Sequence, residues 1–447
     1  MNLVEKILAR ASGRRAVEPG EIVIADVDRL IMHDLSGYLT AEVYDKRVNL
    51  PVRYPERVVM VFDHHFSPPT EQQAVVLESN RQWARKHGIN LLDCGSGNLH
   101  HAVVQRGFVR PGMIVVGSDS HTPVHGTLGA LGVALGNDSH AGTVLPYGKA
   151  WFRVPRTVRI EVSGHQPPGV SPRDVALWLT GQIGEGEFNY AALEFSGPYV
   201  SGLGFWDRWL FPLITVDLGA KCGYVEPDEV TEAFAASLPG GGLGPLERSD
   251  GREAADVLTF DAGEVSPQVA CPPTVGNVYP AAQVAGKQVQ WAELGGHGGG
   301  RLEDIRAAAA ILDGRHVHPG VRFNIVPSSR EVFAAAAREG LVLALHEAGA
   351  TWFPPSTGSN QAYNMGALAP GEAMISTHAR NFPGRNGSPE AETYLASAES
   401  VAAAAVAGEI TDPREFAKAP GGTDEAPPKR AHERARRGTA KAPGDTA

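Results

Sequence analysis

Two clusters of carboxylate and imidazole side chains in the sequence could carry acid–base chemistry. The first is Asp63-His64-His65, the second is Asp119-Ser120-His121-Thr122, and each follows an apolar run. A carboxylate next to an imidazole orients the ring and raises its pKa, which gives a proton donor near neutral pH. The candidate catalytic residues are therefore Asp63, His64, Asp119, Ser120 and His121. Ser120 is also a candidate for contacting the substrate.

Histidines are concentrated in this part of the chain. A third cluster, Asn98-Leu99-His100-His101, adds His100 as a candidate catalytic residue. Of the 16 histidines in the chain, a group lies between residues 64 and 125, namely His64, His65, His100, His101, His121 and His125. A single histidine is more often a hydrogen-bonded structural residue than a catalyst. The concentration of so many in one region favours a functional site.

Two arginines near the end of the chain could bind an acidic substrate. Arg380 and Arg385 flank the turn-forming segment Asn381-Phe382-Pro383-Gly384. Arginine pairs with carboxylates through two parallel hydrogen bonds, so both are candidate substrate-binding residues, with ordinary surface arginines as the alternative. A glycine-rich stretch at residues 126–136 lacks a nucleotide-binding pattern. We interpret it as close helix packing rather than as a phosphate-binding turn.

Strands that end directly before each cluster would position the candidate residues. Residues 58–62 and 113–116 are near-continuous apolar runs of the kind found in buried parallel strands, and residues 323–326 are a third. Because parallel α/β sheets bind ligands beyond the carboxyl ends of their strands, the first two runs would deliver both clusters to a substrate.

Helical patterns alternate with these strands. Residues 71–87 read as an amphipathic helix, and an alanine-rich helix follows Arg301. Ser329 is a plausible N-cap for a helix over residues 330–339, with Gly340 at its C-terminal end. The alternation predicts an α/β fold with parallel sheets.

Composition bounds the possible functions. With 447 residues and 43% hydrophobic content, the chain can bury a sizeable core in about three domains. A net charge of −10 argues against a nucleic-acid partner. The sequence has no apolar run near the ~20 residues that span a bilayer and no signal-peptide pattern, so we expect no membrane partner and a cytoplasmic location. Residues 419–447 contain no Val, Ile, Leu, Met, Phe, Trp or Tyr and are expected to form a disordered tail.

Taken together, the motifs resemble the large subunit of 3-isopropylmalate dehydratase and homoaconitase, in the aconitase superfamily. The resemblance runs from Leu3 to about Lys418. It is carried by several motifs in order, among them Glu5-Lys6-Ile7-Leu8-Ala9-Arg10, Val61-Phe62-Asp63-His64, Gly117-Ser118-Asp119-Ser120-His121-Thr122, Leu368-Ala369-Pro370-Gly371-Glu372 and Arg380-Asn381-Phe382-Pro383-Gly384-Arg385.

The resemblance implies three α/β/α domains of the aconitase large-subunit type around a central cleft. We place them at residues 1–152, 153–270 and 271–418. It also implies a fourth, swivelling domain on a separate small subunit, which carries the family's catalytic base. Members of the family dehydrate and rehydrate hydroxy-di- or tricarboxylic acids.

The same resemblance assigns roles to individual residues. Asp63 and His64 match the family's Asp–His pair, and His100 matches its active-site histidine. Asp119 and His121 match the residues that manage the departing hydroxyl group.

Three further positions are assigned in the same way. Arg380 and Arg385 match the arginines that bind the substrate carboxylate. Asp217 falls where the family has glutamate, a substitution that keeps the charge and shortens the reach by one methylene.

The chain departs from the family at the ligands of its four-iron, four-sulfur (4Fe-4S) cluster. His297, in Gly295-Gly296-His297-Gly298-Gly299, stands where the family has its first ligand cysteine. Counting back from Leu368 puts Thr357 and Asn360 at the other two ligand positions. The actual cysteines, Cys94, Cys222 and Cys271, match none of them.

Iron–sulfur clusters in these sites are bound by thiolates, for which hydroxyl and amide groups are poor substitutes. The sequence therefore predicts that no 4Fe-4S cluster is bound. A single divalent metal ion held by His297 with nearby His or Asp groups is one alternative, and no metal at all is the other.

Three functions are compatible with this pattern. The first is a cluster-free lyase, a dehydratase, hydratase or isomerase, that acts on a small carboxylic acid by His/Asp acid–base chemistry with arginine clamps. The second is a non-catalytic subunit or ligand-binding scaffold. The third is an ordinary isopropylmalate dehydratase large subunit with atypical cluster ligands.

Overall fold

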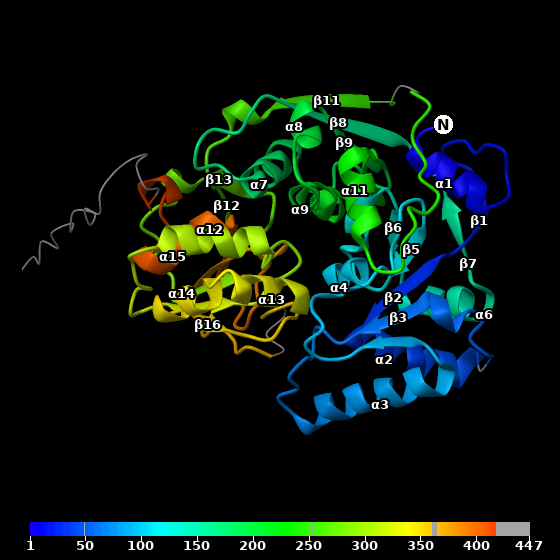
Figure 1. Ribbon diagram of the computed structural model, residues 1–447, viewed down its shortest axis with the longest axis horizontal. Coiled ribbons are helices and arrows are strands. Elements are labelled where there is room, and N and C mark those ends of the chain that lie inside the picture. The colour runs from blue at the N-terminus through cyan, green and yellow to red at the C-terminus, as the bar shows by residue number, and fades with distance from the viewer. Residues whose placement is uncertain (49, 252–253, 255, 360–363, 417–447) are drawn as a thin grey trace, which may run out of the picture.

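The computed structural model describes residues 1–48, 50–251, 254, 256–359 and 364–416. Asn360 and the predicted tail at residues 419–447 lie outside this part of the chain. The strands form three larger sheets and one two-stranded ribbon. Helices cover the larger sheets, and the three parts lie side by side in Figure 1. The α/β architecture expected from the sequence is therefore confirmed.

The first sheet contains five strands in the order β4-β3-β2-β5-β6, all parallel. Its strands are β2 (Arg29–His33), β3 (Val58–Val61), β4 (Asn90–Leu92), β5 (Ile114–Gly117) and β6 (Leu131–Ala134). The apolar runs predicted at residues 58–62 and 113–116 form β3 and β5, both buried throughout. A fully buried parallel strand has no polar face, which explains why these segments lack alternation.

Helices lie on both faces of the first sheet. In Figure 1, α2 (Asp34–Val43) and α3 (Glu71–His87) lie below it and α4 (Leu99–Gln105) lies above. The amphipathic helix predicted at residues 71–87 is α3, which begins after the Thr70 cap and ends at Gly88 in the left-handed conformation. Helix α1 (Leu3–Ala11) precedes an antiparallel ribbon of β1 (Ile22–Asp26) and β7 (Lys149–Arg153).

The second sheet has the order β10-β9-β8-β11 and is also parallel. Its strands are β8 (Thr157–Ser163), β9 (Ala192–Ser196), β10 (Cys222–Val225) and β11 (Asp256–Asp261), and its helices include α7 (Pro172–Ile183), α8 (Pro198–Ser201), α9 (Phe205–Arg208), α10 (Leu210–Leu213) and α11 (Glu229–Ser237). One apolar core joins it to the first sheet, since Val59 and Val115 belong to the same buried cluster as Ile160 and Leu193.

The third sheet has seven strands in the order β13-β12-β18-β17-β14-β15-β16. They are β12 (Gln268–Ala270), β13 (Val278–Pro280), β14 (Trp291–Leu294), β15 (Arg322–Ile325), β16 (Thr351–Trp352), β17 (Ala373–Ser376) and β18 (Glu392–Ala396). The strand predicted at residues 323–326 is β15. The all-parallel expectation is wrong at one edge, where β12 pairs antiparallel with both β13 and β18.

Helices of the third sheet pack around a core of their own. They are α12 (Leu302–Leu312), α13 (Arg330–Arg338), α14 (Leu341–Glu347) and α15 (Ala398–Ala407). The Ser329 side chain accepts a hydrogen bond from the Val332 amide, and Gly340 has φ 77°, which confirms the predicted cap and helix end. The domain boundaries after residues 152 and 270 stay a prediction.

The glycine-rich stretch at residues 126–136 differs from our interpretation. It completes a 3-10 helix, Thr122–Leu128, and then enters β6 instead of forming an α-helix. A Cβ on Gly126 would lie 1.8 Å from the Gly223 carbonyl oxygen of β10, so the close packing is between this short helix and a strand.

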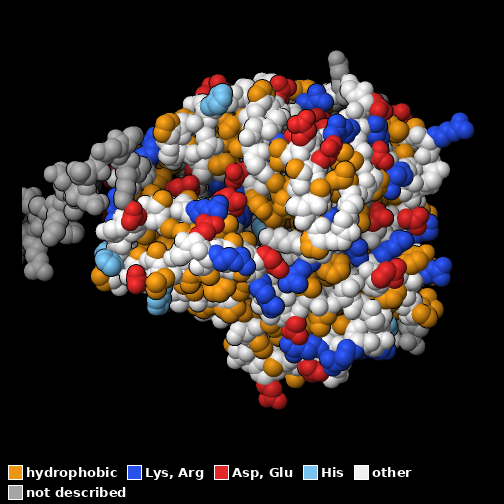
Figure 2. Space-filling model, viewed as in Figure 1, with side chains coloured by type: hydrophobic (Ala, Val, Ile, Leu, Met, Phe, Trp, Pro, Cys, Tyr) orange, Lys and Arg blue, Asp and Glu red, His pale blue; other side chains and the backbone are white. Residues whose placement is uncertain are grey.

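Two surface properties bear on the classes of partner. Basic and acidic side chains are interspersed on the face shown in Figure 2. Among the described helices, none combines the length and apolar character needed to cross a membrane.

Candidate functional site

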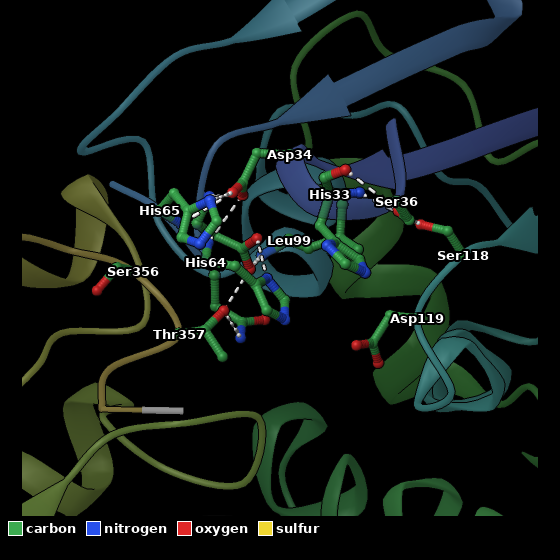
Figure 3. A network of polar contacts seen from close by, with 12 residues as sticks. His33, Asp34, Ser36, His64, His65, Leu99, Ser118, Asp119, Ser356 and Thr357 are labelled. Carbon is green, nitrogen blue, oxygen red and sulfur yellow. Dashed lines mark hydrogen bonds and ion pairs between the residues drawn. The ribbon is translucent and has the colours of Figure 1, made fainter. Parts of the chain in front are cut away.

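The first candidate cluster forms a turn at the end of β3 that is held by a buried carboxylate. Asp34 Oδ1 accepts hydrogen bonds from the backbone amides of Asp63 (3.1 Å) and His64 (2.9 Å), and Oδ2 accepts one from His65 (2.8 Å). Figure 3 shows Asp34 facing this turn. Asp34 was not among the residues predicted from the sequence, although it follows the apolar run of β2 as the candidate clusters follow β3 and β5.

His64 is positioned by Asp63 on one side and His33 on the other. His64 Nδ1 lies 2.8 Å from Asp63 Oδ1, and the His64 ring stacks on His33 with 4.0 Å between centroids. Burial alone would lower the pKa of His64, but the Asp63 carboxylate raises it to about 9. The His64 ring is therefore charged at neutral pH, and its role as a proton donor stays a prediction.

Asp63 also connects the first sheet to the third. Its Oδ2 accepts hydrogen bonds from the Leu99 amide, 2.8 Å away, and from the Thr357 hydroxyl. The Thr357 oxygen in turn accepts a hydrogen bond from Asn98 Nδ2 at 3.2 Å. Thr357, predicted to stand at a cluster-ligand position, thus directs its hydroxyl to Asp63.

The second candidate cluster is organised around the carboxylate of Asp119. Oδ1 lies 3.1 Å from His100 Nε2 and 3.3 Å from His121 Nδ1, and Oδ2 lies 3.5 Å from His297 Nε2. Burial opposes ionisation, but these imidazoles hold the pKa of Asp119 well below its usual range. The three sequence-predicted histidines therefore meet at one carboxylate.

The two clusters share one buried site. Ligand atoms of His33, His64 and Asp119 all lie within 4.8 Å of one another, and in Figure 3 the Asp119 carboxylate points into the space that the His33 and His64 rings face. The His297 ring stacks on His121 with 4.8 Å between centroids. Ser120 lies at the less buried edge, with Oγ 3.4 Å from His121 Nδ1.

Most imidazoles around Asp119 are neutral at physiological pH. Burial lowers the pKa values of His33 and His121 to about 3, although the carboxylates oppose the shift. Burial also lowers the pKa of His297. The pKa of His64 is thus raised, whereas the pKa values of its neighbours are lowered. Such opposed shifts are typical of sites in which one group acts as an acid and another as a base.

Arg380 and Asp217 form the polar group next to His121. Arg380 Nε lies 3.6 Å from Asp217 Oδ1, and the guanidinium contributes to the lowered pKa of His121. The catalytic role of Asp217 stays a prediction. Burial raises the pKa of Asp217 to about 7 even though Arg380 opposes it, so this carboxyl titrates near neutrality.

Arg385 is buried beside Phe382, and its guanidinium carbon lies 5.3 Å from the centre of that ring. Its role as a carboxylate clamp stays a prediction. His101 and His125 are also buried, but His101 stacks on Trp206 at 5.2 Å between centroids, as expected of a structural histidine.

A second carboxylate–imidazole pair supports the loop that carries His297. Glu293 Oε1 lies 2.8 Å from His378 Nε2 and accepts a hydrogen bond from the Ser359 amide at 2.9 Å. The Thr377 hydroxyl accepts from the Gly295 amide and donates to its carbonyl, both at 2.9 Å. This pair was not predicted from the sequence, because Glu293 lies in β14 and His378 in the loop after β17, far apart in the chain.

The three cysteines do not join the site. Burial raises the pKa values of Cys94 and Cys222 to about 12 and that of Cys271 to about 11, so all three remain thiols at neutral pH. Within the described residues, the groups of side chains that could hold a metal contain histidine and carboxylate donors and no cysteine.

Comparison with known proteins finds relatives along nearly the whole chain. The family model described as "Aconitase family (aconitate hydratase)" matches residues 5–287 and 275–408. The 3-isopropylmalate dehydratase large subunit 1 of Methanopyrus kandleri is 40% identical over 416 residues, which cover 93% of this chain and 99% of that protein. The homoaconitase large subunit of Thermus thermophilus is 39% identical over 419 residues, with 93% and 97% covered. The crystal structure of Thermococcus kodakaraensis aconitase X in its holo form aligns with a TM-score of 0.49 and 11% identity, over 80% of this chain and 84% of that chain.

Proposed function

The chain belongs to the aconitase family, and we propose that it is a hydro-lyase that acts on a small hydroxycarboxylic acid without an iron–sulfur cluster. One observation carries the proposal. The acid–base residues of the first sheet converge on a buried site whose third-sheet contributors are His297 and Thr357, neither of which offers a thiolate.

The donor set supports the absence of a 4Fe-4S cluster. Such a cluster is held by thiolates, and the residues described here do not fit it. The Thr357 hydroxyl is bonded to Asp63, and the three cysteines retain their protons. Asn360, the remaining ligand position, carries an amide. We therefore route no catalytic step through such a cluster.

His64 is the proposed proton donor. In the dehydration direction, a base removes the proton from the carbon next to a substrate carboxylate, and the carbon–oxygen bond breaks with its electron pair moving to the hydroxyl oxygen. The His64 imidazolium gives its proton to that oxygen, so the products are an alkene and water. Such a transfer contributes about 10²–10⁴-fold to the rate. Hydration runs through the same groups in reverse.

Arg380 is the proposed binding group for a substrate carboxylate. Its side chain is about 29% exposed, and its charge contributes to the lowered pKa of His121. We include Arg385 as a second clamp on the resemblance alone. The relatives named above are large subunits, so we also propose that a separate small subunit completes the site and supplies the base that removes the carbon-bound proton.

The experiment combines turnover with analysis of sulfide. The purified chain, alone and with its small subunit, is assayed for hydration of unsaturated di- and tricarboxylic acids through the loss of alkene ultraviolet absorbance. Acid-labile sulfide is measured on the same sample after anaerobic treatment with iron and sulfide. We expect turnover with sub-stoichiometric sulfide, and a loss of at least about 100-fold in His64→Gln. His346→Gln, at an exposed histidine of α14, is the matched control.

Two results would overturn the proposal. If the chain bound iron and acid-labile sulfide in stoichiometric amounts, it would be an ordinary isopropylmalate dehydratase large subunit with atypical cluster ligands. Carboxylate binding without turnover of any hydroxy acid, with the small subunit present, would identify a ligand-binding scaffold.

A further inference from the structure

Two imidazole nitrogens and one carboxylate converge within the site. His100 Nε2 lies 3.1 Å from Oδ1 of Asp119, and His297 Nε2 lies 3.5 Å from its Oδ2. One ligand atom from each of the three residues lies within 4.8 Å of the others. All three side chains are buried, so this arrangement is built into the interior rather than being a chance grouping on the surface.

The polar atoms of this group are incompletely satisfied. Within the described residues, His297 Nε2 and His121 Nε2 are buried without a hydrogen-bond partner. A buried polar nitrogen left unpartnered destabilises the folded chain by about 1–3 kcal/mol, so such atoms are normally satisfied by something. A cation placed between His297 and Asp119 would satisfy the first of them.

The surroundings of His100 also fit a ligand. Its other ring nitrogen, Nδ1, lies 3.3 Å from Nε2 of the fully buried His125. Histidines that bind metals use their second nitrogen in this way, because the outer hydrogen bond fixes the ring and its tautomer.

We propose that His100, Asp119 and His297 bind a single divalent transition-metal ion. Imidazole and carboxylate donors suit zinc, iron, manganese and nickel, and three protein ligands leave open positions for water or a substrate oxygen. The inference deepens the proposed function, because a cation here would act as a Lewis acid on the departing hydroxyl. Binding of the ion does not itself depend on catalysis.

The two neighbouring groups of potential ligands are poorer sites. In the group of Asp34, Asp63 and His64, each carboxylate oxygen already contacts a backbone amide or His64 Nδ1. Asp119 differs, because the His121 amide contacts only its Oδ1, at 2.7 Å, and Oδ2 is left to face His297. In the group of His33, His64 and Asp119, the two rings stack face to face, so their nitrogens are not aimed at one point.

The test is direct metal binding by the full chain after removal of metals with a chelator. Titration with Co²⁺ is followed by visible absorption and calorimetry, and Zn²⁺ is then used as a competitor. We expect one equivalent of Co²⁺ to bind with the visible bands of a low-coordinate site and to be displaced by Zn²⁺. His297→Ala should weaken binding by more than about 100-fold, beyond the 10–100-fold typical of an outer contact. The matched control is His346→Ala, which removes an exposed histidine.

A second measurement guards against variants that fail to fold. Zn²⁺ should raise the thermal unfolding midpoint of the parent chain and of His346→Ala, and leave that of His297→Gln unchanged. Equal Co²⁺ binding in parent and His297 variants, or no binding at micromolar concentration, would overturn the inference. Turnover by a chain that binds no Co²⁺ would overturn the inference and leave the proposed function standing. One bound equivalent of Co²⁺ without turnover of any hydroxy acid would overturn the proposed function and leave the inference standing.

Discussion

The hydroxyl of Thr357 donates a hydrogen bond to the carboxylate of Asp63, which joins a loop of the third sheet to the acid–base pair of the first. The backbone repeats the connection, because the Thr357 amide donates to the Asp63 carbonyl oxygen at 3.2 Å. Thr357, which the resemblance places at a cluster-ligand position, therefore contacts Asp63, the carboxylate that raises the pKa of His64.

Removing this hydroxyl should change the pH dependence of catalysis. In Thr357→Val, Asp63 loses a donor to its charged form, so its pKa rises from about 2. The carboxylate stays ionised at neutral pH, and without the competing hydroxyl it stabilises the His64 imidazolium more strongly. A hydrogen bond to a charged group contributes about 1.5–3 kcal/mol, which corresponds to roughly one pH unit or more. We expect the alkaline limb of the kcat profile, near pH 9 in the parent, to move up by as much as about one unit. Thr357→Ser should retain the parent profile, and an unshifted Thr357→Val would contradict the role given to Asp63.

Arg380 and Asp217 should make substrate affinity depend on pH. Asp217 has a pKa raised by burial to about 7, so above that pH its carboxylate competes with the substrate for Arg380. KM should therefore rise as pH passes 7 in the parent and stay flat in Asp217→Asn. Arg380→Lys, which loses the two-pronged contact, should raise KM about 10-fold, or about 1.4 kcal/mol.

Arg306→Lys is the control for this pair of measurements. Arg306 forms an exposed ion pair with Glu339 on the helices of the third sheet, and its replacement should leave KM unchanged. A KM in Asp217→Asn that still rises through neutrality would show that another group titrates.

Buried neutral histidines should make the fold sensitive to acid. Burial lowers the pKa values of His33 to about 3 and of His140 to about 4, and that of His101 well below its usual value. The unfolded chain binds these protons below about pH 6.5 and the folded chain does not, so stability is complete above 6.5 and is lost as pH falls toward 4. Each such histidine contributes up to about 1.4 kcal/mol per pH unit to the slope.

His140→Leu tests this expectation, since neither ring nitrogen of His140 has a partner within the described residues. Urea unfolding between about pH 6.5 and 4 should show a slope reduced by up to ~1.4 kcal/mol per pH unit in the variant. His346→Leu, at an exposed position, should keep the parent slope. Parallel curves for parent and His140→Leu would mean that His140 is protonated in the fold.

The loop that carries His297 should be intolerant of a methyl group at Gly299. A Cβ there would lie 1.9 Å from Thr377 Oγ1, the atom that bridges the Gly295 amide and carbonyl. We expect Gly299→Ala to destabilise the chain by about 1–3 kcal/mol and lower its thermal midpoint. Gly142→Ala, where a Cβ would meet nothing within 4 Å, should leave the midpoint unchanged or higher.

Local signals in the sequence predicted the elements that carry the site. The apolar runs of β3 and β5 and the caps of α3 and α13 are each encoded within a few neighbouring residues. Polar residues directly after β3 and β5 could be assigned to a site because parallel strands end at one edge. The same rule applied to β2 would have found Asp34.

Other features depend on contacts that no local pattern encodes. His297 meets Asp119 across 178 residues of sequence, since 297 − 119 = 178, and Glu293 meets His378 across 85. The charge of Asp217 depends on burial by surrounding elements. Strand β12 has three residues and pairs antiparallel with β18. The direction of this pairing depends on the rest of the third sheet and could not be predicted from those three residues.

His100 and Asp119 come from the part of the chain that forms the first sheet, whereas His297 comes from the part that forms the third, so the candidate site lies on the boundary between two cores. Moving one part away from the other would also separate Phe66 from Trp291 and Val326, with which it shares a buried apolar cluster. Cross-linking the two cores would trap whatever the site contained when the link formed.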